Sequence, residues 1–464
     1  MYKTNKKKNK KNFSLPHVFA ILVILALLAA AASWFVPAGE YERLPDDTVV
    51  PDSYQTVESQ PINIFEVFTA IPEGLETAAM MVFTVFIIGG SFAVIKDTKV
   101  IDVLVNKMSN KLANRKYIFI ATIISIISLI SAFIGLLELS LVYIPILIPI
   151  CLALRFDSVT AAAIALTGSA AGFTAALTNP FTLAISQEIG GLELYSGIGF
   201  RSITLIIMTL IAIIFVTLYA RKIEKEPEKS ITYEIDQKKI KNVDNVETTK
   251  FTLRLKFVTL IAILGFITLI IGILQFDWYL KEIDAIFIIT AVLSGIVAGF
   301  NINVICEKFI KGLQDFVLAA FAAGIARAVP GVLEDANILD TVVFGISQIV
   351  QSLPSSITAV GMLISQAALN FLIPAGSGQA LASMPIMFPL ADITGLTRQV
   401  AILAFQFGDG FSNIIYPTSG FLWACIGMAG IPYEKWVKFL FPLIIIWYVV
   451  GAIFVIIAQS IGWS

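Results

Sequence analysis

The chain has 464 residues, of which 57% are hydrophobic and only 14% are charged. Its mean hydropathy of +0.86 indicates a protein that has lipid rather than water as its solvent. Three widely separated cysteines and a single histidine exclude a disulfide framework, a CxxC metal site, a histidine metal cluster and a Ser/His/Asp triad. We therefore predict a polytopic membrane protein that is not an enzyme and does not bind nucleic acid.

The N-terminus combines a basic tail with an apolar run. Six lysines lie between residues 3 and 11, and the apolar run extends from Val18 to Val36. About 19 apolar residues can cross a hydrocarbon core ~30 Å thick, whereas the apolar region of a signal peptide is shorter. We interpret the run as an uncleaved first span, which places the tail, residues 1–17, in the cytoplasm.

Loop charges orient the later spans. Residues 37–74 carry eight carboxylates against the single cation Arg43, which is typical of a loop outside the cytoplasm. Residues 96–116, which include an amphipathic stretch over 100–108, carry six cations and are predicted to lie inside. The segment 221–256 has ten cations and seven carboxylates, and we expect a mobile cytoplasmic linker there.

Residues 117–154 lie between Lys116 and Arg155, two positions that we predict to face the cytoplasm. The segment is interrupted by Gly135, Glu138 and two prolines. A pair of spans or a re-entrant hairpin would return the chain to the same side. Polar and proline-bearing breaks favour a hairpin, since irregular backbone at membrane depth must be buried within protein. A second interrupted segment, 356–390, surrounds residues 374–379, and we also predict broken helices over 158–189 and 400–423.

The predicted fold is an all-α membrane protein with about nine transmembrane helices and two re-entrant hairpins. The first membrane half covers residues 18–220 and the second covers 257–464, with the C-terminus outside. The expected spans are residues 18–36, 75–95, 158–189, 203–220, 257–273, 285–300, 316–329, 400–423 and 439–461.

The two halves resemble one another in sequence. The run Val94–Asp97 with Asp102 matches Val332–Asp335 with Asp340, a shift of 238 positions. Two further matches, Pro145–Pro149 with Pro385–Pro389 and Gly172–Thr174 with Gly410–Ser412, lie at shifts of 240 and 238. Loop charges reverse between the copies, because Lys96 corresponds to Glu334. Opposite insertion requires such a reversal, so we predict an inverted repeat with a substrate site between its copies.

Polar residues cluster at the predicted apices and breaks. Amides such as Asn179 and Asn413 are costly in lipid unless they have partners, whereas small hydroxyls such as Ser169 and Thr174 could equally serve helix packing. The candidate residues for binding a substrate or ion are Glu138, Ser169, Thr174, Thr178, Asn179, Ser377, Gln379, Asp409, Ser412, Asn413 and Thr418.

Four charged residues near the predicted spans require separate interpretations. A charge at the centre of a membrane helix costs roughly 2.5–3.5 kcal/mol, so Glu138 and Asp409 are functional candidates, with a structural acid as the alternative. We interpret Asp157 as half of an interfacial pair with Arg155. Arg201, at the outer end of a span, is explained by snorkelling.

Several motifs of the second half resemble a known family. The apex Gly376–Gln379, the run Met384–Met387 and the stretch Phe405–Asn413 followed by Tyr416–Thr418 are similar to those of the YfcC-like carriers. These carriers belong with anaerobic four-carbon dicarboxylate, short-chain fatty acid and p-aminobenzoyl-glutamate transporters in the ion transporter superfamily. The resemblance spans nearly the whole chain, and it implies a homodimer with an elevator mechanism.

The sequence indicates the substrate less directly than it indicates a membrane transporter. No Arg or Lys lies near either hairpin apex in the sequence, whereas Glu138 and Asp409 do. Fixed anions repel a dicarboxylate and suit a cationic group, while helix N-termini can hold a carboxylate. We favour an amino acid, such as arginine exchanged for ornithine, with a four-carbon dicarboxylate or another carboxylate as the runner-up. The argument fails if the two acids instead serve a coupling proton or sodium ion.

A channel is the alternative from a different class. It would use similar polar residues, but it would form a continuous pore rather than paired breaks in an inverted repeat. We expect no cofactor other than a sodium ion or proton in the role of coupling ion. The expected partners are a small solute, lipid and a second copy of the chain in the cytoplasmic membrane.

Overall fold

The computed structural model describes residues 17–101, 103, 115–244, 252–276 and 278–464. Nearly all of the predicted cytoplasmic tail and most of the predicted amphipathic stretch 100–108 lie outside the described residues. Within the described part, seven helices are long and apolar enough to cross a membrane. They cover residues 79–97, 116–134, 158–189, 198–225, 253–273, 317–335 and 433–460.

The nine predicted spans differ from these seven helices for identifiable reasons. Helix α1 (Val18–Ala32) has only 15 residues, and α12 (Leu280–Ala298) has three charged residues near its start. One expected span is divided into α18 (Arg398–Ser412) and α19 (Gly420–Ala429), as predicted for a broken helix. In contrast, α5 (Lys116–Ile134), which we assigned to a hairpin, has the length and composition of a span on its own.

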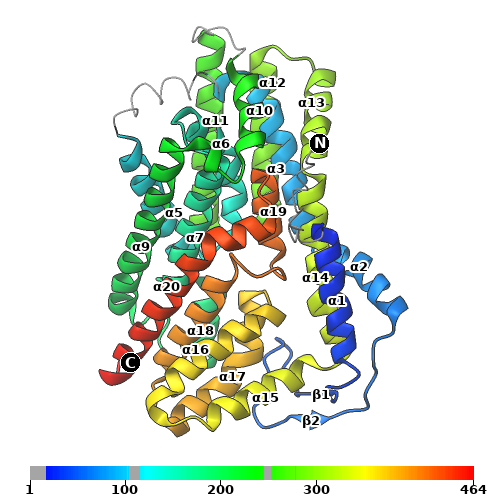
Figure 1. The fold of residues 1–464 in the computed structure, drawn as a ribbon, viewed down its shortest axis with the longest axis vertical. Helices are drawn as coiled ribbons and strands as arrows, with labels where there is room; N and C mark the ends of the chain where they lie inside the picture. Colours follow the sequence, from blue (N-terminus) through cyan, green and yellow to red (C-terminus); the bar gives the residue numbers. More distant parts are fainter. Residues whose placement is uncertain (1–16, 102, 104–114, 245–251, 277) are drawn as a thin grey trace, which may run out of the picture.

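The helices form two groups, each packed mainly within itself. The first group contains α1, α2 (Ile64–Thr77), α3 (Ala79–Asp97), α11 (Leu253–Phe276), α12, α13 (Ile302–Asp315) and α14 (Val317–Asp335). The second contains α5, α6 (Ser140–Ala153), α7 (Ser158–Ala175), the π-helical turn η2 (Pro180–Ala184), α8 (Ile185–Ile189), α9 (Ile198–Lys225), α16 (Ser355–Leu372), α17 (Gly376–Thr394), α18, α19 and α20 (Tyr433–Ser460). In Figure 1, α1, α2, α13 and α14 run along one side of the molecule and α5, α9 and α20 along the other.

Elements recur in the same order in the two halves. Helices α2 and α3 correspond to α13 and α14, which begin and end 238 residues later. The contacts are exchanged between the pairs: a Cβ added to Gly74 of α2 would lie 2.7 Å from Ala328 N of α14, and one added to Gly312 of α13 would lie 2.6 Å from Gly89 O of α3. The recurrence is a property of the fold, whereas the opposite insertion of the halves stays a prediction.

A small sheet covers one end of the molecule. Strand β1 (Gly39–Glu40) pairs antiparallel with β2 (Gln55–Thr56), and this sheet lies beside α15 (Leu339–Gln351) at the lower end of Figure 1. An ion pair of 2.7 Å between Arg43 and Asp340 joins the two segments. The first segment was predicted to lie outside, and the structure places Asp340 beside it.

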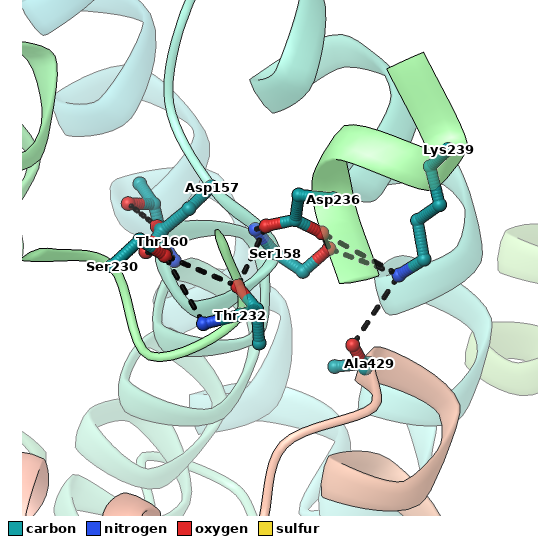
Figure 2. Close-up of polar contacts among 8 residues, drawn as sticks. All are labelled: Asp157, Ser158, Thr160, Ser230, Thr232, Asp236, Lys239 and Ala429. Carbon is teal, nitrogen blue, oxygen red and sulfur yellow. Dashed lines mark hydrogen bonds and ion pairs between the residues drawn. The ribbon is translucent and has the colours of Figure 1, made fainter. Parts of the chain in front are cut away.

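The predicted linker is folded where the structure describes it. Helix α9 continues to Lys225, and a 3-10 turn, η3 (Pro227–Lys229), and α10 (Tyr233–Asp244) follow. Residues 245–251 lie outside the described residues. The expectation of a mobile linker is wrong for residues 230–239, because a buried polar cluster attaches them to the second group of helices (Figure 2).

Asp157 forms one half of this attachment. Its Oδ1 accepts a hydrogen bond of 2.8 Å from Thr160 N and so caps α7. Its Oδ2 accepts from the hydroxyls of Tyr219 and Ser230, each at 2.7 Å. The residue is 3% exposed, so Asp157 is a buried cap joined to the linker rather than half of an interfacial pair with Arg155.

Asp236 of α10 forms the other half. It accepts hydrogen bonds of 2.9 Å from Ser158 N and 2.6 Å from Thr232 Oγ1 (Figure 2). Lys239 Nζ lies 3.7 Å from the same carboxylate and donates to Ala429 O, at the end of α19, at 3.3 Å. Burial lowers the pKa of the Lys239 ammonium, against the attraction of Asp236. The cluster therefore connects α10 with the start of α7 and the end of α19.

Candidate functional site

The hairpin apices and the breaks of the discontinuous helices meet at one cavity of about 430 Å³. The second group of helices contributes both apices, residues 135–138 and 374–377, and residues at the two breaks. The first group contributes the α2–α3 junction, the start of α12, and Ala323 and Arg327 of α14. The cavity therefore lies between the two groups.

Four of the predicted site residues line this cavity: Glu138, Ser377, Asn413 and Thr418. Glu138 is half-buried in a 3-10 turn, η1 (Leu137–Leu139), between α5 and α6. Ser377 lies in the first turn of α17, and Asn413 directly follows α18. The Thr418 hydroxyl is buried without a hydrogen-bond partner.

Asp409 lies directly behind the cavity wall and is fully buried in α18. Its Oδ1 accepts hydrogen bonds from Asn370 Nδ2 at 2.6 Å and from Asn413 Nδ2 at 2.8 Å. Its Oδ2 has no hydrogen-bond partner, and a Cβ added to the cavity-lining Gly376 would lie 3.0 Å from it. One oxygen is thus held by amides, while the other can accept a proton, a cation or a donor group.

A network of amides from α16 supports Asp409. Asn370 also donates to Gln379 Oε1 at 3.1 Å and accepts from Ser412 Oγ at 2.8 Å, and Gln379 Nε2 donates to Gln366 Oε1 at 2.7 Å. Asn370 and Gln366 were not among the predicted site residues. Their signal was present, because two amides spaced four residues apart share one face of an otherwise apolar helix and need partners in lipid.

Asn179 fixes the first break. Its Oδ1 accepts hydrogen bonds from Phe181 N at 2.9 Å and from Thr182 N at 3.2 Å, which caps the turn η2. The side chain also packs on the first hairpin apex, where Gly135 has a φ of 72° and an added Cβ would lie 2.1 Å from Asn179 Oδ1. Gln406 Nε2 donates to Thr182 Oγ1 at 2.7 Å and ties α18 to the same turn.

Three predicted residues make other contacts. Ser169 Oγ accepts a hydrogen bond of 2.9 Å from Ser140 Oγ, and Thr174 Oγ1 donates to Ala170 O, one turn earlier, at 2.6 Å. Thr178 donates to a backbone carbonyl near the end of α5 at 3.0 Å. Such contacts support the packing interpretation that the sequence left open for Ser169 and Thr174.

Arg327 brings a cation to the cavity. The prediction that no Arg or Lys lies near the hairpin apices is therefore wrong for the folded protein. Helix α14 packs against α19 and brings Arg327 to the cavity. Its Nη2 lies 3.6 Å from Glu334 Oε1, which is longer than a charge-assisted hydrogen bond. Since a guanidinium has five N–H donors, most remain available to a ligand.

A family model described as "C4-dicarboxylate anaerobic carrier" (DcuC) matches residues 15–460. An Escherichia coli (strain K12) protein named "Putative basic amino acid antiporter YfcC" is 28% identical, and the match covers 98% of each chain. A Haemophilus influenzae protein is 27% identical over 98% of this chain and 99% of its own. These names describe carriers and an antiporter rather than enzymes.

Two solved structures also match, both of them transport proteins. The Alcanivorax borkumensis YdaH transporter is 15% identical, with a TM-score of 0.43 and coverage of 97% of this chain and 99% of its own. The efflux pump MtrF of Neisseria gonorrhoeae is 16% identical, with the same TM-score and coverage of 97% and 96%. At this TM-score, neither likeness supports an inference about the site.

Proposed function

Because the chain belongs to the C4-dicarboxylate anaerobic carrier family of membrane transporters, we propose that it is a secondary active transporter of a small organic solute, an amino acid. The observation that carries this proposal is the single cavity at which both hairpin apices and the helix breaks meet. Secondary transporters typically bind solutes where discontinuous helices of two structural halves meet, near the middle of the membrane.

The charges around the cavity favour a zwitterionic amino acid. Glu138 and the unpartnered Oδ2 of Asp409 can attract a cationic group, and Arg327 can attract a carboxylate. One relative is named as a basic amino acid antiporter, which supports arginine exchanged for ornithine as the specific hypothesis.

A four-carbon dicarboxylate, or another carboxylate, is the second candidate. Arg327 and the description of the family favour it. Glu138 and Asp409 count against it, because two anions at the site repel a dianion unless they bind protons or a coupling cation. The coupling ion we propose is a proton or a sodium ion held at Asp409 Oδ2.

We further propose that the second group of helices moves past the first, as the elevator mechanism of the family implies. The contact between α14 and α19 supports this motion. A Cβ added to Gly420 would lie 2.5 Å from Ala323 O, and one added to Gly427 would lie 2.6 Å from Ala319 Cβ. At both points small residues face one another and the two helix backbones approach closely. In the proposed homodimer, the first group is the fixed part.

Counterflow in proteoliposomes tests the proposal. Vesicles loaded with unlabelled arginine or ornithine should take up labelled arginine faster than empty vesicles, because a carrier is trans-stimulated by internal substrate. Uptake without trans-stimulation would indicate a channel. Trans-stimulation by succinate or fumarate, with none by arginine or ornithine, would replace the amino acid with the dicarboxylate.

A further inference from the structure

The two breaks leave helix ends of different character. At the first break, Asn179 accepts hydrogen bonds from two N–H groups and thereby closes the end of η2. At the second break, Ser419 is the N-cap of α19 but makes no side-chain cap hydrogen bond. Ser419, Gly420 and Phe421 all line the cavity. The positive end of α19 is therefore presented to the cavity without a side-chain cap, although Leu422 N donates to Ser419 O at 3.1 Å.

Two side chains reinforce this helix end. Thr418 lies directly before the N-cap, lines the cavity, is 1% exposed, and has a buried hydroxyl without a hydrogen-bond partner. Arg327 continues the row of Ala319 and Ala323 at intervals of four residues, so the three share one face of α14. Because Ala323 touches Gly420 at the start of α19, Arg327 lies on the side of the break.

We propose that the uncapped first turn of α19, the Thr418 hydroxyl and the Arg327 guanidinium together form a carboxylate-binding subsite. Backbone N–H groups, a hydroxyl and a guanidinium supply only hydrogen-bond donors to an anion, and the helix end adds a partial positive charge. This inference rests on the proposed transport function and assigns the carboxylate end of its solute.

Helix α17 begins at the cavity as well, and Ala375 gives it no side-chain cap. Its first residue, Gly376, lies beside the unpartnered Oδ2 of Asp409, so that an anion there would face the Asp409 carboxylate. The carboxylate is therefore assigned to α19, and the cationic end of the solute to the side of Glu138 and Asp409. The subsite also joins the two helix groups, because Arg327 belongs to the first group and α19 to the second.

The test compares solutes that differ only in the carboxylate. Arginine and its decarboxylated analogue agmatine compete against labelled arginine in counterflow, using the full-length protein in liposomes. Wild type should prefer arginine, and Arg327→Gln should remove most of that preference, a loss on the order of 10–100-fold, with little change for agmatine. Thr418→Val should change the ratio in the same direction by a smaller factor.

Glu334→Gln is the matched control, because it removes the partner of Arg327 in the ion pair and leaves the guanidinium in place. It should keep the preference of the wild type. Arg327→Lys, which retains the charge without the planar fork, should lie between wild type and Arg327→Gln. An unchanged arginine-to-agmatine ratio in folded Arg327→Gln, or an equal loss in Glu334→Gln, would overturn the subsite.

The counterflow results would differ if the proposed transport function itself were wrong. If wild type exchanges succinate instead of arginine, the amino acid assignment fails, but the subsite still predicts weaker competition by succinate in Arg327→Gln than in wild type. If wild type shows no counterflow with either solute, both the proposed function and the subsite are wrong.

Discussion

Docking of the linker on the second group of helices can be broken at one carboxylate. In the variant Asp236→Ala, Ser158 N and Thr232 Oγ1 lose their acceptor, and Lys239 loses the charge 3.7 Å away. Removing one partner of a buried pair costs about 3–5 kcal/mol, and Asp236 is only 4% exposed. Because Lys239 is partly solvated, we take the lower end, about 3 kcal/mol. That loss should raise the undocked population of α10 by roughly a hundredfold.

Hydrogen exchange of the α10 backbone amides measures this population in the purified protein. Exchange in peptides covering residues 233–239 should accelerate by roughly two orders of magnitude in Asp236→Ala. Glu234→Ala is the control, since Glu234 is exposed on the same helix and should leave exchange within a few-fold of wild type. Equal exchange rates in Asp236→Ala and wild type would refute the docked linker and the role of Asp236 in it.

Three other predictions concern orientation and the site. A cysteine at Asp52 should react with an impermeant reagent from outside, and one at Asn110, outside the described residues, only after permeabilisation; external labelling of the latter would overturn the inverted repeat. Asn413→Ala should abolish uptake without loss of expression or dimer assembly, whereas normal uptake would leave this amide a packing residue. Gly135→Ala should lower both the melting temperature and uptake, because its φ is 72° and its Cβ would meet Asn179 at 2.1 Å; unchanged melting would contradict that contact.

The sequence located the interruptions of the apolar segments well. The predicted hairpins 117–154 and 356–390 correspond to α5–α6 and α16–α17, and the predicted breaks fall at residues 176–179 and 413–419. These positions were predictable because glycine, proline and polar residues interrupt apolar helices for local reasons, which a single segment reveals. The family resemblance drawn from the same motifs is confirmed by the match over residues 15–460.

The errors concern contacts between distant segments. Arg327 has no local signal that relates it to the hairpin apices, and only the packing of α14 on α19 brings it to the cavity. Arg201 was interpreted as snorkelling, but it is fully buried, with Nη2 3.4 Å from Gln399 Oε1 and the guanidinium 5.4 Å from the Trp463 ring. The polar composition of the linker likewise concealed Asp236, whose partner Ser158 lies elsewhere in the chain.

Glu138 and Asp409 should have separable roles in transport. Glu138 lines the cavity directly, whereas Asp409 lies behind Gly376 with one oxygen held by amides and the other without a partner. A solute's cationic group reaches Glu138 first, while a proton or sodium ion is small enough to reach Asp409 Oδ2.

We therefore expect Glu138→Gln to weaken binding of a cationic amino acid more than that of a neutral analogue. Asp409→Asn should abolish ion-driven accumulation yet spare exchange, since exchange needs no net ion movement. Uptake and exchange of charged and neutral solutes, measured at several pH and sodium values, distinguish the two roles. Wild-type behaviour of both variants in every condition would make the acids structural and remove the main support for a cationic amino acid.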